Sequence, residues 1–373
     1  MPIRRVKPPD EGDEQLVTFR LQNRLKEGHM RASTCGLLKL PVRTCGVAVV
    51  AALLLASCCP ADEYWPATAE DAPAQTEPIP WESVVDDNPD EGDGFTMAQS
   101  CCPSKPRYHW RDTLSIFVGY EGSKQPQDFG VNAHFGARTA VNWGGPIWQD
   151  WGLRFQLGTS INATANAVQV VQRIEGNSAR TQSFTTVGIF QRTQSGLTWA
   201  VAHDFLYQEY YDEFFLSQWR GRFGWQCGRC DEVGVQCALS GHGNDGNFGA
   251  VPLRLQPITQ ASFYWRHTFP MQAELTGWCG IAEGHSEANI ALGDLPRTDE
   301  VLAYGSDVFI PLSNYLALFG EANFLTPADT GTVDAYLGIE IFPWGGATGA
   351  RSHRFSPVLP VANNTSMSVD LYR

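Results

Sequence analysis

Between residues 113 and 342, apolar and polar side chains alternate along the chain. In residues 131–138 (VNAHFGAR), for example, every second residue is apolar and the residues between are mainly polar. A period of two predicts β-strands that have one apolar and one polar face. The same alternation returns in three later segments, at 153–161, 219–226 and 333–342. No helical period is equally persistent in this region, so the pattern predicts an all-β domain.

The alternation marks about twelve strands. We place them near residues 113–120, 129–140, 152–162, 182–192, 196–207, 216–227, 232–240, 257–268, 271–283, 299–310, 314–325 and 332–342. After the first strands, the connections alternate between tight turns and longer loops, which is typical of outer-membrane barrels. Most segments are about as long as a tilted strand must be to cross the hydrocarbon of a bilayer.

These features predict an antiparallel up-and-down β-barrel of about twelve strands, because closure pairs every strand edge. An even strand count places both chain ends at the end with the tight turns. The polar face of the strands then lines the lumen. Its candidate lining residues are Asn132, His134, Arg138, Arg154, Gln156, Arg220, Arg222, Gln226, Glu274, Asp334 and Glu340. A lumen of this size leaves open whether the barrel is a pore or is plugged.

The region before the barrel divides into three parts. Residues 1–29 are polar and of mixed charge, and we interpret them as a non-native N-terminal extension. Residues 30–57 predict a signal peptide, because a basic stretch precedes the uncharged, mostly apolar Gly46–Ala56. This peptide ends in Leu55-Ala56-Ser57-Cys58, which resembles a lipobox with Cys58 as the lipidation site. Ordinary cleavage at the small residues is the alternative.

Residues 58–112 predict a disordered, acidic, Pro-rich linker. Its central part, residues 60–100, contains no Lys or Arg, and its few apolar residues show no period. The whole chain carries a formal net charge of −13. Because an acidic chain without a basic patch repels phosphate backbones, we exclude nucleic acid as a partner. Residues 343–373 follow the last predicted strand as a C-terminal tail.

Four cysteines near the predicted tight-turn end are candidates for disulfides. Cys227 and Cys230 form a CxxC in a predicted turn, and Cys101 and Cys102 precede the barrel. In an exported protein a disulfide is favoured over zinc, which usually needs a second pair with suitable spacing. The pairing does not follow from the sequence.

We identify no catalytic, cofactor-binding or metal-binding residues. His203 and Asp204 are neighbours on one strand, so their side chains point to opposite faces and cannot form a dyad. The glycine-rich residues 241–247 lack the spaced carboxylates of a calcium loop, and we interpret them as a flexible loop. A lipase-type barrel is disfavoured, because no Ser stands beside a suitable His in the patterned strands. The sequence therefore predicts a protein that is not an enzyme.

Three segments resemble an uncharacterised family of exported bacterial proteins regarded as outer-membrane β-barrels. They are residues 141–162 (VNWGGPIWQDWGLRFQLGTSIN), 226–235 (QCGRCDEVGV) and 354–369 (RFSPVLPVANNTSMSV). The resemblance covers about residues 108–370 and implies the barrel fold, but no activity. One departure stands out: many outer-membrane proteins end on an aromatic residue of the last strand, whereas here about thirty residues follow it.

The sequence thus predicts a non-enzymatic barrel in the cell outer membrane, acting as a passive pore or in a structural or surface role. Its expected partners are outer-membrane lipid and small solutes. The alternative is a soluble or lipid-anchored periplasmic β-barrel or sandwich that binds a small apolar or carbohydrate ligand.

Overall fold

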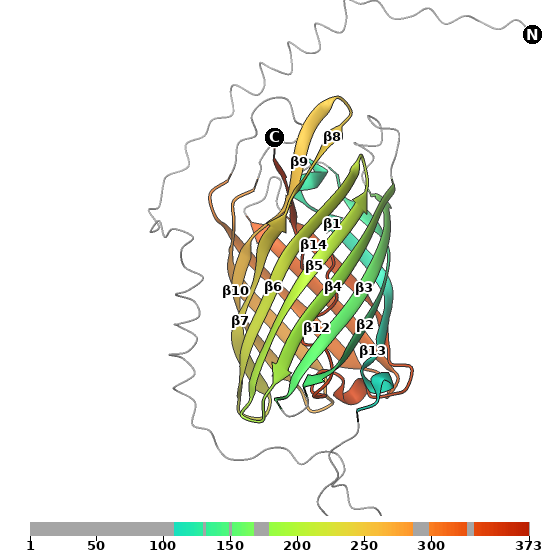
Figure 1. Cartoon of the computed structure of the whole chain (residues 1–373), viewed down its shortest axis with the longest axis vertical. Coiled ribbons are helices and arrows are strands. Elements are labelled where there is room, and N and C mark those ends of the chain that lie inside the picture. The colour runs from blue at the N-terminus through green and yellow to red at the C-terminus, as the bar shows by residue number, and fades with distance from the viewer. Residues whose placement is uncertain are drawn as a thin grey trace, which may run out of the picture. The chain divides into compact units, whose positions relative to one another are not determined.

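The computed structural model describes residues 108–129, 132–148, 151–167, 179–285, 298–326 and 332–372. Twelve strands form one closed antiparallel barrel, in the order β1-β14-β13-β12-β11-β10-β7-β6-β5-β4-β3-β2 (Figure 1). Their bounds are β1 Ser115–Lys124, β2 His134–Trp148, β3 Leu153–Asn166, β4 Ala179–Arg192, β5 Leu197–Glu209, β6 Glu213–Cys227, β7 Asp231–His242, β10 Gln260–Thr268, β11 Glu274–Ala282, β12 Val301–Pro311, β13 Leu316–Thr326 and β14 Val333–Ile341. The predicted fold class is confirmed.

The first and last strands of the barrel close the ring. β1 pairs with β14 from Ile116 opposite Ile341 to Lys124 opposite Val333. At the middle of this seam Gly119 lies opposite Gly338, and a Cβ atom on Gly119 would come within 2.6 Å of the Gly338 Cα. Because no other residue lacks a Cβ, glycine at these two positions lets the strands approach closely enough to close the barrel.

The two ends of the barrel differ in their connections. Tight turns join β2 to β3, β4 to β5, β6 to β7, β10 to β11 and β12 to β13, and we call this the short-turn end. Gly196 and Gly228 lie in two of these turns at φ 85° and 73°, a conformation that favours glycine. The other connections gather at the opposite end, which we call the long-loop end; all of them are longer except the one from β5 to β6, which has three residues (Figure 1).

The alternation seen in the sequence separates the two surfaces of the barrel. Outward-facing strand positions carry exposed large apolar side chains, which we call the apolar belt. It includes Val118, Tyr120, Phe135, Val141, Leu157, Ile161, Val187, Ile189, Val201, Phe215, Trp219, Val233, Leu239, Phe263, Ile281, Leu302 and Leu337. The inward face carries buried polar and charged side chains, and also apolar clusters, one of which includes Phe117, Phe309 and Phe319.

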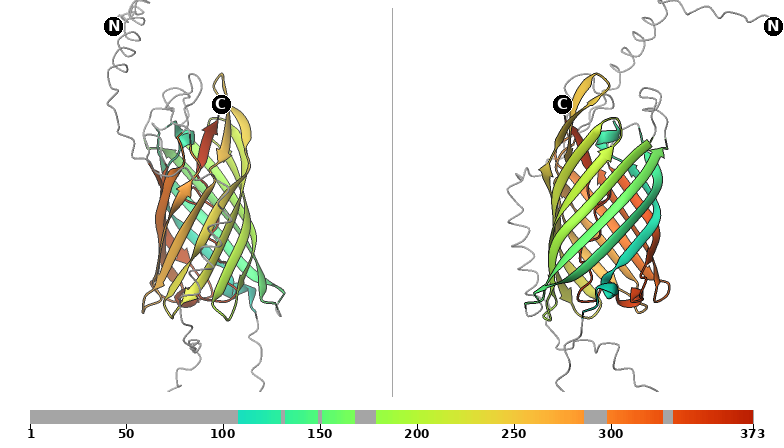
Figure 2. Two further views of the ribbon diagram at one scale, coloured as in Figure 1. Left: turned by 90° about the vertical axis from the view of Figure 1, so that its left-hand side faces the viewer. Right: turned by 45° about the vertical axis from the view of Figure 1, so that its right-hand side comes forward.

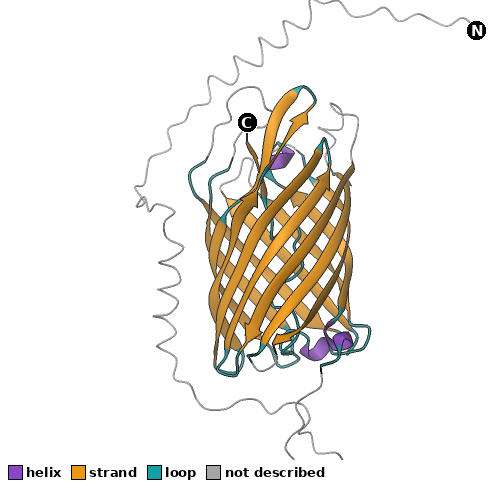
Figure 3. Ribbon diagram, in the orientation of Figure 1, coloured by secondary structure: helices purple, strands orange, loops and turns teal. Residues whose placement is uncertain are grey.

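The C-terminal segment, residues 351–372, runs through the lumen. After β14 the chain forms a short 3-10 helix, η5 (Ala347–Gly349), at the short-turn end, where Ala347 N–H donates to the Asn314 carbonyl. The segment then enters the barrel beside Tyr108, whose ring centroid lies 5.0 Å from that of Phe355. Figure 3 shows it as irregular chain inside the ring of strands. β1 begins and β14 ends at the short-turn end, but the expectation that both chain ends lie there is wrong for the C-terminus.

A second, smaller sheet receives the C-terminal segment at the long-loop end. It consists of β8 (Asn244–Phe248), β9 (Val251–Pro257) and β15 (Val369–Tyr372), in the order β15-β9-β8. Figure 2 shows the β8–β9 hairpin rising above the barrel next to the C-terminus. The interpretation of residues 241–247 as a flexible loop is wrong, because β8 pairs with β9 through most of this stretch.

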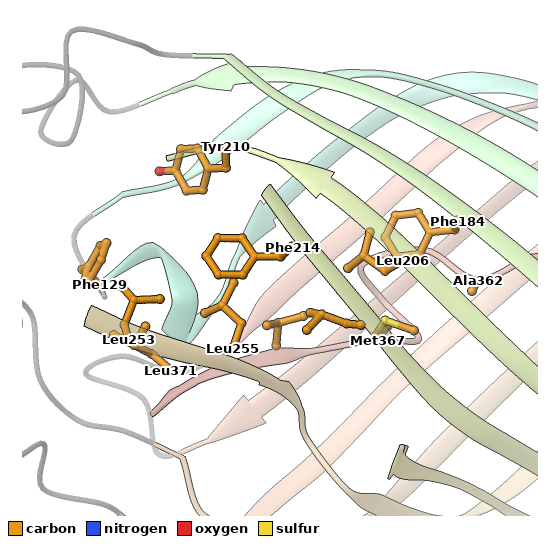
Figure 4. Close-up of a cluster of buried hydrophobic side chains, with 12 residues drawn as sticks. Phe129, Phe184, Leu206, Tyr210, Phe214, Leu253, Leu255, Ala362, Met367 and Leu371 are labelled. Atoms are coloured by element: carbon orange, nitrogen blue, oxygen red, sulfur yellow. The ribbon is translucent and has the colours of Figure 1, made fainter. Parts of the chain in front are cut away.

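An apolar core fastens this sheet to the barrel. Leu253 and Leu255 from β9 pack with Leu371 and Met367 of the C-terminal segment, and strand residues such as Phe214 complete the cluster (Figure 4). Leu255, Met367 and Leu371 are completely buried. We call this cluster the cap core; it closes one end of the lumen with side chains that exclude water.

The predictions for residues 1–29, for the signal peptide at 30–57 and for nearly all of the linker at 58–112 lie outside the described residues, as does Cys58. Among the residues that the structure describes, no helix is long and apolar enough to cross a bilayer. The described chain begins with residue 108 and the 3-10 helix η3 (Trp110–Thr113) at the short-turn end.

Truncating Leu371 to alanine is expected to destabilise the barrel by about 2–5 kcal/mol, because the substitution leaves a cavity in the cap core. Denaturant unfolding measures the change. Leu312→Ala is the matched control: Leu312 lies in the β12–β13 turn with 58% of its surface exposed, so we expect a change within about 0.5 kcal/mol. Equal effects of the two substitutions would contradict the burial of Leu371.

Candidate functional site

The lumen is the candidate functional site, because it brings together most of the buried polar groups of the chain. Eight of the candidate lining residues are buried on inward-facing strand positions: His134, Arg138, Arg154, Gln156, Arg220, Arg222, Glu274 and Asp334. Asn132 is buried just before β2, and Glu340 is half-buried in β14. Gln226 is exposed near the end of β6, where it lies at the rim.

The backbone of the C-terminal segment binds side chains of β3, β4 and β6. The Gln156 amide accepts from Leu359 N–H at 3.3 Å and donates to the Leu359 carbonyl at 3.2 Å. Arg220 Nη2 donates to the Pro360 carbonyl at 2.8 Å. Ala362 N–H donates to Thr186 Oγ1 at 2.9 Å. The inward polar side chains thus supply the hydrogen-bond partners that a neighbouring strand would supply to the backbone of a β-strand.

The C-terminal segment makes a tight turn at residues 363–365 within the lumen. Asn363 Oδ1 accepts from Thr365 N–H at 2.7 Å and so fixes the turn. Asn364 and Gln182 exchange two amide hydrogen bonds, both 2.9 Å long. The Asn364 amide also donates to Glu121, which accepts a further bond from Asn162 at 2.8 Å. One side chain of the C-terminal segment therefore joins β1, β3 and β4.

A second buried group surrounds Asp204 on β5. Arg220 holds the Asp204 carboxylate with two nitrogens, Nε at 2.5 Å and Nη2 at 3.0 Å, and Thr186 and Gln218 donate to its oxygens. Such a bidentate pair is well satisfied although it is buried. His203 faces outward instead, with its ring 4.4 Å from those of Phe205 and Trp219. The inference that His203 and Asp204 cannot act as a dyad agrees with this geometry.

The connection between β1 and β2 contributes an acidic residue at the long-loop end. Asp128 belongs to the 3-10 helix η4 (Pro126–Asp128) and lies 3.2 Å from Arg180 and 3.2 Å from His134. Burial alone would raise the pKa of the Asp128 carboxyl, but Arg180 and His134 outweigh it and hold the pKa below its ordinary value. Nearby, Asn132 Nδ2 donates to the Tyr210 hydroxyl at 2.8 Å.

A third polar group lies toward the short-turn end. Glu232 accepts from the Tyr264 hydroxyl at 2.6 Å and pairs with Arg266, while Glu274 lies 3.7 Å from Arg266. Arg222 lies over the Tyr264 ring at 3.9 Å. A further charged pair joins the C-terminal segment to the wall, because Arg351 Nη1 donates to Asp307 at 2.9 Å.

Sequence reasoning missed Glu121, Asp128, Arg180, Gln182 and Asp204. Gln182 and Asp204 lie inside predicted strands, but the two-residue period does not mark them, because Gln182 has the polar neighbours Thr181 and Ser183 and Asp204 follows His203. Glu121 lies one residue beyond the predicted end of the first strand. Asn364 carries no periodic signal, because it belongs to an irregular segment whose partners are distant in the sequence.

The structure assigns no metal or disulfide to these groups. No cluster of His, Cys, Asp and Glu suited to a metal ion occurs among the described residues. Cys227 and Cys230 flank the β6–β7 turn and are not joined to each other, and the Cys227 thiol lies 3.8 Å from the Trp225 carbonyl. Cys101 and Cys102 lie outside the described residues, so a bridge that involves them stays a prediction.

Comparison with solved structures finds bacterial outer-membrane barrels. An outer-membrane channel from Pseudomonas putida F1 has a TM-score of 0.43 and 10% identity, over 61% of this chain and 94% of that chain. The translocator domain of the autotransporter NalP from Neisseria meningitidis has a TM-score of 0.39 and 9% identity, over 62% and 89%. Outer membrane phospholipase A from Escherichia coli has a TM-score of 0.34 and 9% identity, over 61% and 95%.

Comparison with curated proteins finds no match. A family model described as a family of unknown function, DUF6666, matches residues 113–369. The match covers the barrel and the C-terminal segment, including the three stretches that carry the resemblance seen in the sequence. It spans more than half of the chain, and this chain therefore belongs to the family of unknown function DUF6666.

Proposed function

We propose that this protein is a non-enzymatic barrel of the cell outer membrane whose lumen is closed by its own C-terminal segment. It spans the bilayer with its twelve strands, with the short-turn end toward the periplasm and the longer loops outside. Its role is structural or lies at the surface, and it is not a permanently open pore. The apolar belt is the observation that carries the membrane part of this proposal.

The belt fits lipid better than water. Residues such as Val141, Ile161 and Leu337 are between 39% and 54% exposed although they are large and apolar. Soluble monomers rarely expose continuous apolar surfaces beyond a few hundred Å². A soluble barrel that binds an apolar ligand would carry the reverse arrangement, with apolar rows inside. The outward apolar rows therefore favour acyl chains as the surroundings of the strands.

Aromatic rings lie near both edges of the belt. At the short-turn end Trp148 and Trp151 stack with centroids 4.7 Å apart and are both more than half exposed. Toward the long-loop end Tyr120 stacks on Phe135 at 5.8 Å. Amphipathic rings in these positions are typical of the two interfaces between hydrocarbon and water.

Closure of the lumen favours one of the roles that the sequence left open. The C-terminal segment is bonded to β1, β3, β4 and β6 inside the ring and then ends in the small sheet over the cap core. A segment held at so many points along the lumen blocks free passage of solutes. This supports a closed barrel and not a passive pore.

Substituting Leu337 in the middle of β14 by arginine is expected to destabilise the barrel in lipid by about 2–4 kcal/mol, because the charge enters hydrocarbon. Folding titrations in vesicles measure the effect. Leu312→Arg, at a turn outside the belt, is the matched control, and its expected cost is about 0–1 kcal/mol. Solubility of the unmodified barrel without detergent, or equal costs for both variants, would refute the membrane assignment.

In planar bilayers we expect the full chain to show no steady conductance, because the C-terminal segment fills the lumen. A variant that ends at residue 350 is expected to conduct, since its polar lumen becomes open to water. Heat-dependent gel mobility serves as the control for folding of the truncated chain. A steadily conducting full chain would contradict closure by the C-terminal segment.

Because the C-terminal segment ends at the long-loop end, an epitope tag that follows Arg373 should be accessible on intact cells. A tag inserted before residue 108 should be accessible only after the outer membrane is opened. Antibody labelling of cells before and after permeabilisation compares the two. The opposite pattern of labelling would show that the proposed orientation is wrong.

A further inference from the structure

An arginine and two tryptophans meet at the short-turn end, beside the seam where β1 and β14 close the barrel. Trp110 and Arg111 belong to η3, which precedes β1, and Trp344 follows β14. The centroids of the two indole rings lie 5.5 Å apart. The guanidinium carbon of Arg111 lies 5.5 Å from the centroid of Trp110 and 5.6 Å from that of Trp344. The two ends of the barrel domain thus build one cluster, which we call the rim arginine site.

Hydrogen bonds hold both stretches of the rim arginine site in place. The indole N–H of Trp143, which faces outward on β2, donates to the Trp110 carbonyl at 3.1 Å. On the other stretch, the N–H of Gly346 donates to the Asn314 side chain at 2.9 Å and so fixes the turn that follows Trp344. The two rings are therefore in position before a ligand arrives, which lowers the entropy cost of binding.

The charge of Arg111 is accessible and is not used within the chain. Arg111 is exposed, and 49% of Trp110 and 46% of Trp344 are exposed beside it. The Arg111 side chain forms no ion pair or hydrogen bond with the residues that the structure describes, its exposed neighbour Asp112 included. A guanidinium that lies against aromatic rings keeps its N–H groups free for two oxygens of a phosphate. The cluster is therefore suited to an anion.

The far side of the same rim has the opposite preference. β7 and β10 lie across the ring from β1, and there Asp231 accepts from the Trp265 indole at 2.9 Å. The Asp231 carboxylate also lies 2.8 Å from Nδ1 of His267. Aromatic rings thus surround a carboxylate on that side, and a carboxylate repels phosphate. The unpaired cation distinguishes the rim arginine site from this other aromatic part of the rim.

An apolar row of the outer surface begins next to the site. Ile116 on β1 lies opposite Ile341 on β14 and opposite Val141 on β2, and the three side chains face outward. Only residues 342–343 separate Ile341 from Trp344, and only residues 112–115 separate Arg111 from Ile116. A ligand that carries acyl chains next to a phosphate matches both parts of this surface, whereas a free phosphate matches only the arginine.

We propose that the rim arginine site binds the headgroup phosphate of a phospholipid in the periplasmic leaflet of the outer membrane. The Arg111 guanidinium donates to two phosphate oxygens, and the indoles of Trp110 and Trp344 lie at the level of the glycerol region. An acyl chain lies along the row that contains Ile116 and Ile341. The inference rests on the membrane role proposed above and adds a specific lipid contact at the seam of the barrel.

The test is native mass spectrometry of the full chain, folded in an uncharged detergent, with dimyristoylphosphatidylglycerol, dimyristoylglycerol or inorganic phosphate. We expect saturable binding of the phospholipid, about tenfold tighter than that of dimyristoylglycerol, which has the same chains but no phosphate. Inorganic phosphate should not displace the phospholipid. Dimyristoylglycerol that binds as tightly would show that the chains alone decide, and displacement by inorganic phosphate would show a free-anion site. Either result would overturn the proposal.

Arg111→Gln should weaken phospholipid binding about tenfold, because it removes the charge that faces the phosphate. Arg354→Gln is the matched control, since Arg354 is exposed at the same end and lies over one ring only, that of Phe355 at 5.1 Å, and it should leave binding unchanged. Arg111→Met decides the question if Arg111→Gln does not fold, which heat-dependent gel mobility monitors.

Phospholipid binding that both Arg111 variants leave intact would overturn the proposal, as would an equal loss in Arg354→Gln. The vesicle experiments described above separate this outcome from failure of the membrane role. A chain that enters vesicles but binds phospholipid independently of Arg111 contradicts only the rim arginine site, whereas a barrel that stays soluble without detergent refutes the membrane assignment itself.

Discussion

A polar group removed from water must find a partner, and this constraint governs the interior of the barrel. Strands that expose apolar rows to lipid turn their polar rows inward, where Glu121, Gln182 and Asp204 are completely buried. Strand side chains satisfy Asp204, whereas Glu121 and Gln182 also take a partner from the C-terminal segment. The C-terminal segment supplies further donors and acceptors from its backbone and from Asn364. The alternation that turns apolar side chains toward lipid therefore also creates an interior of polar side chains that need these partners.

Two kinds of contact hold the C-terminal segment in the lumen. Polar contacts hold the middle of the C-terminal segment, whereas apolar contacts hold its end in the cap core, where Leu371 pairs opposite Leu255. Each kind of contact stabilises the other, because fixing one part of the segment lowers the entropy cost of ordering the rest. Only small cavities remain beside the segment.

Most of the barrel was predictable from the sequence, but the C-terminal segment inside its lumen was not. A two-residue period determines which side chains share a face, so twelve strands and residues such as Arg138 and Arg220 followed from local pattern. The strand β15 and the Asn364 contacts depend on partners more than a hundred residues away, such as Leu255 and Gln182, and no local period reports them. Residues 244–248 form a strand that pairs with β9, and β15 pairs with the other edge of β9, an arrangement that the composition of these residues does not reveal.

The most direct test of the account is a cysteine cross-link between the wall and the C-terminal segment. In the structure Ser160 Oγ donates to the Ala362 carbonyl at 3.0 Å, whereas Ile161 faces outward on the same strand. In a background without the other cysteines of the barrel, Ser160→Cys with Ala362→Cys should form a disulfide on mild oxidation, detectable by mass spectrometry. Ile161→Cys with Ala362→Cys should not. Failure of the first pair to cross-link in the folded protein would contradict a lumen filled by the C-terminal segment.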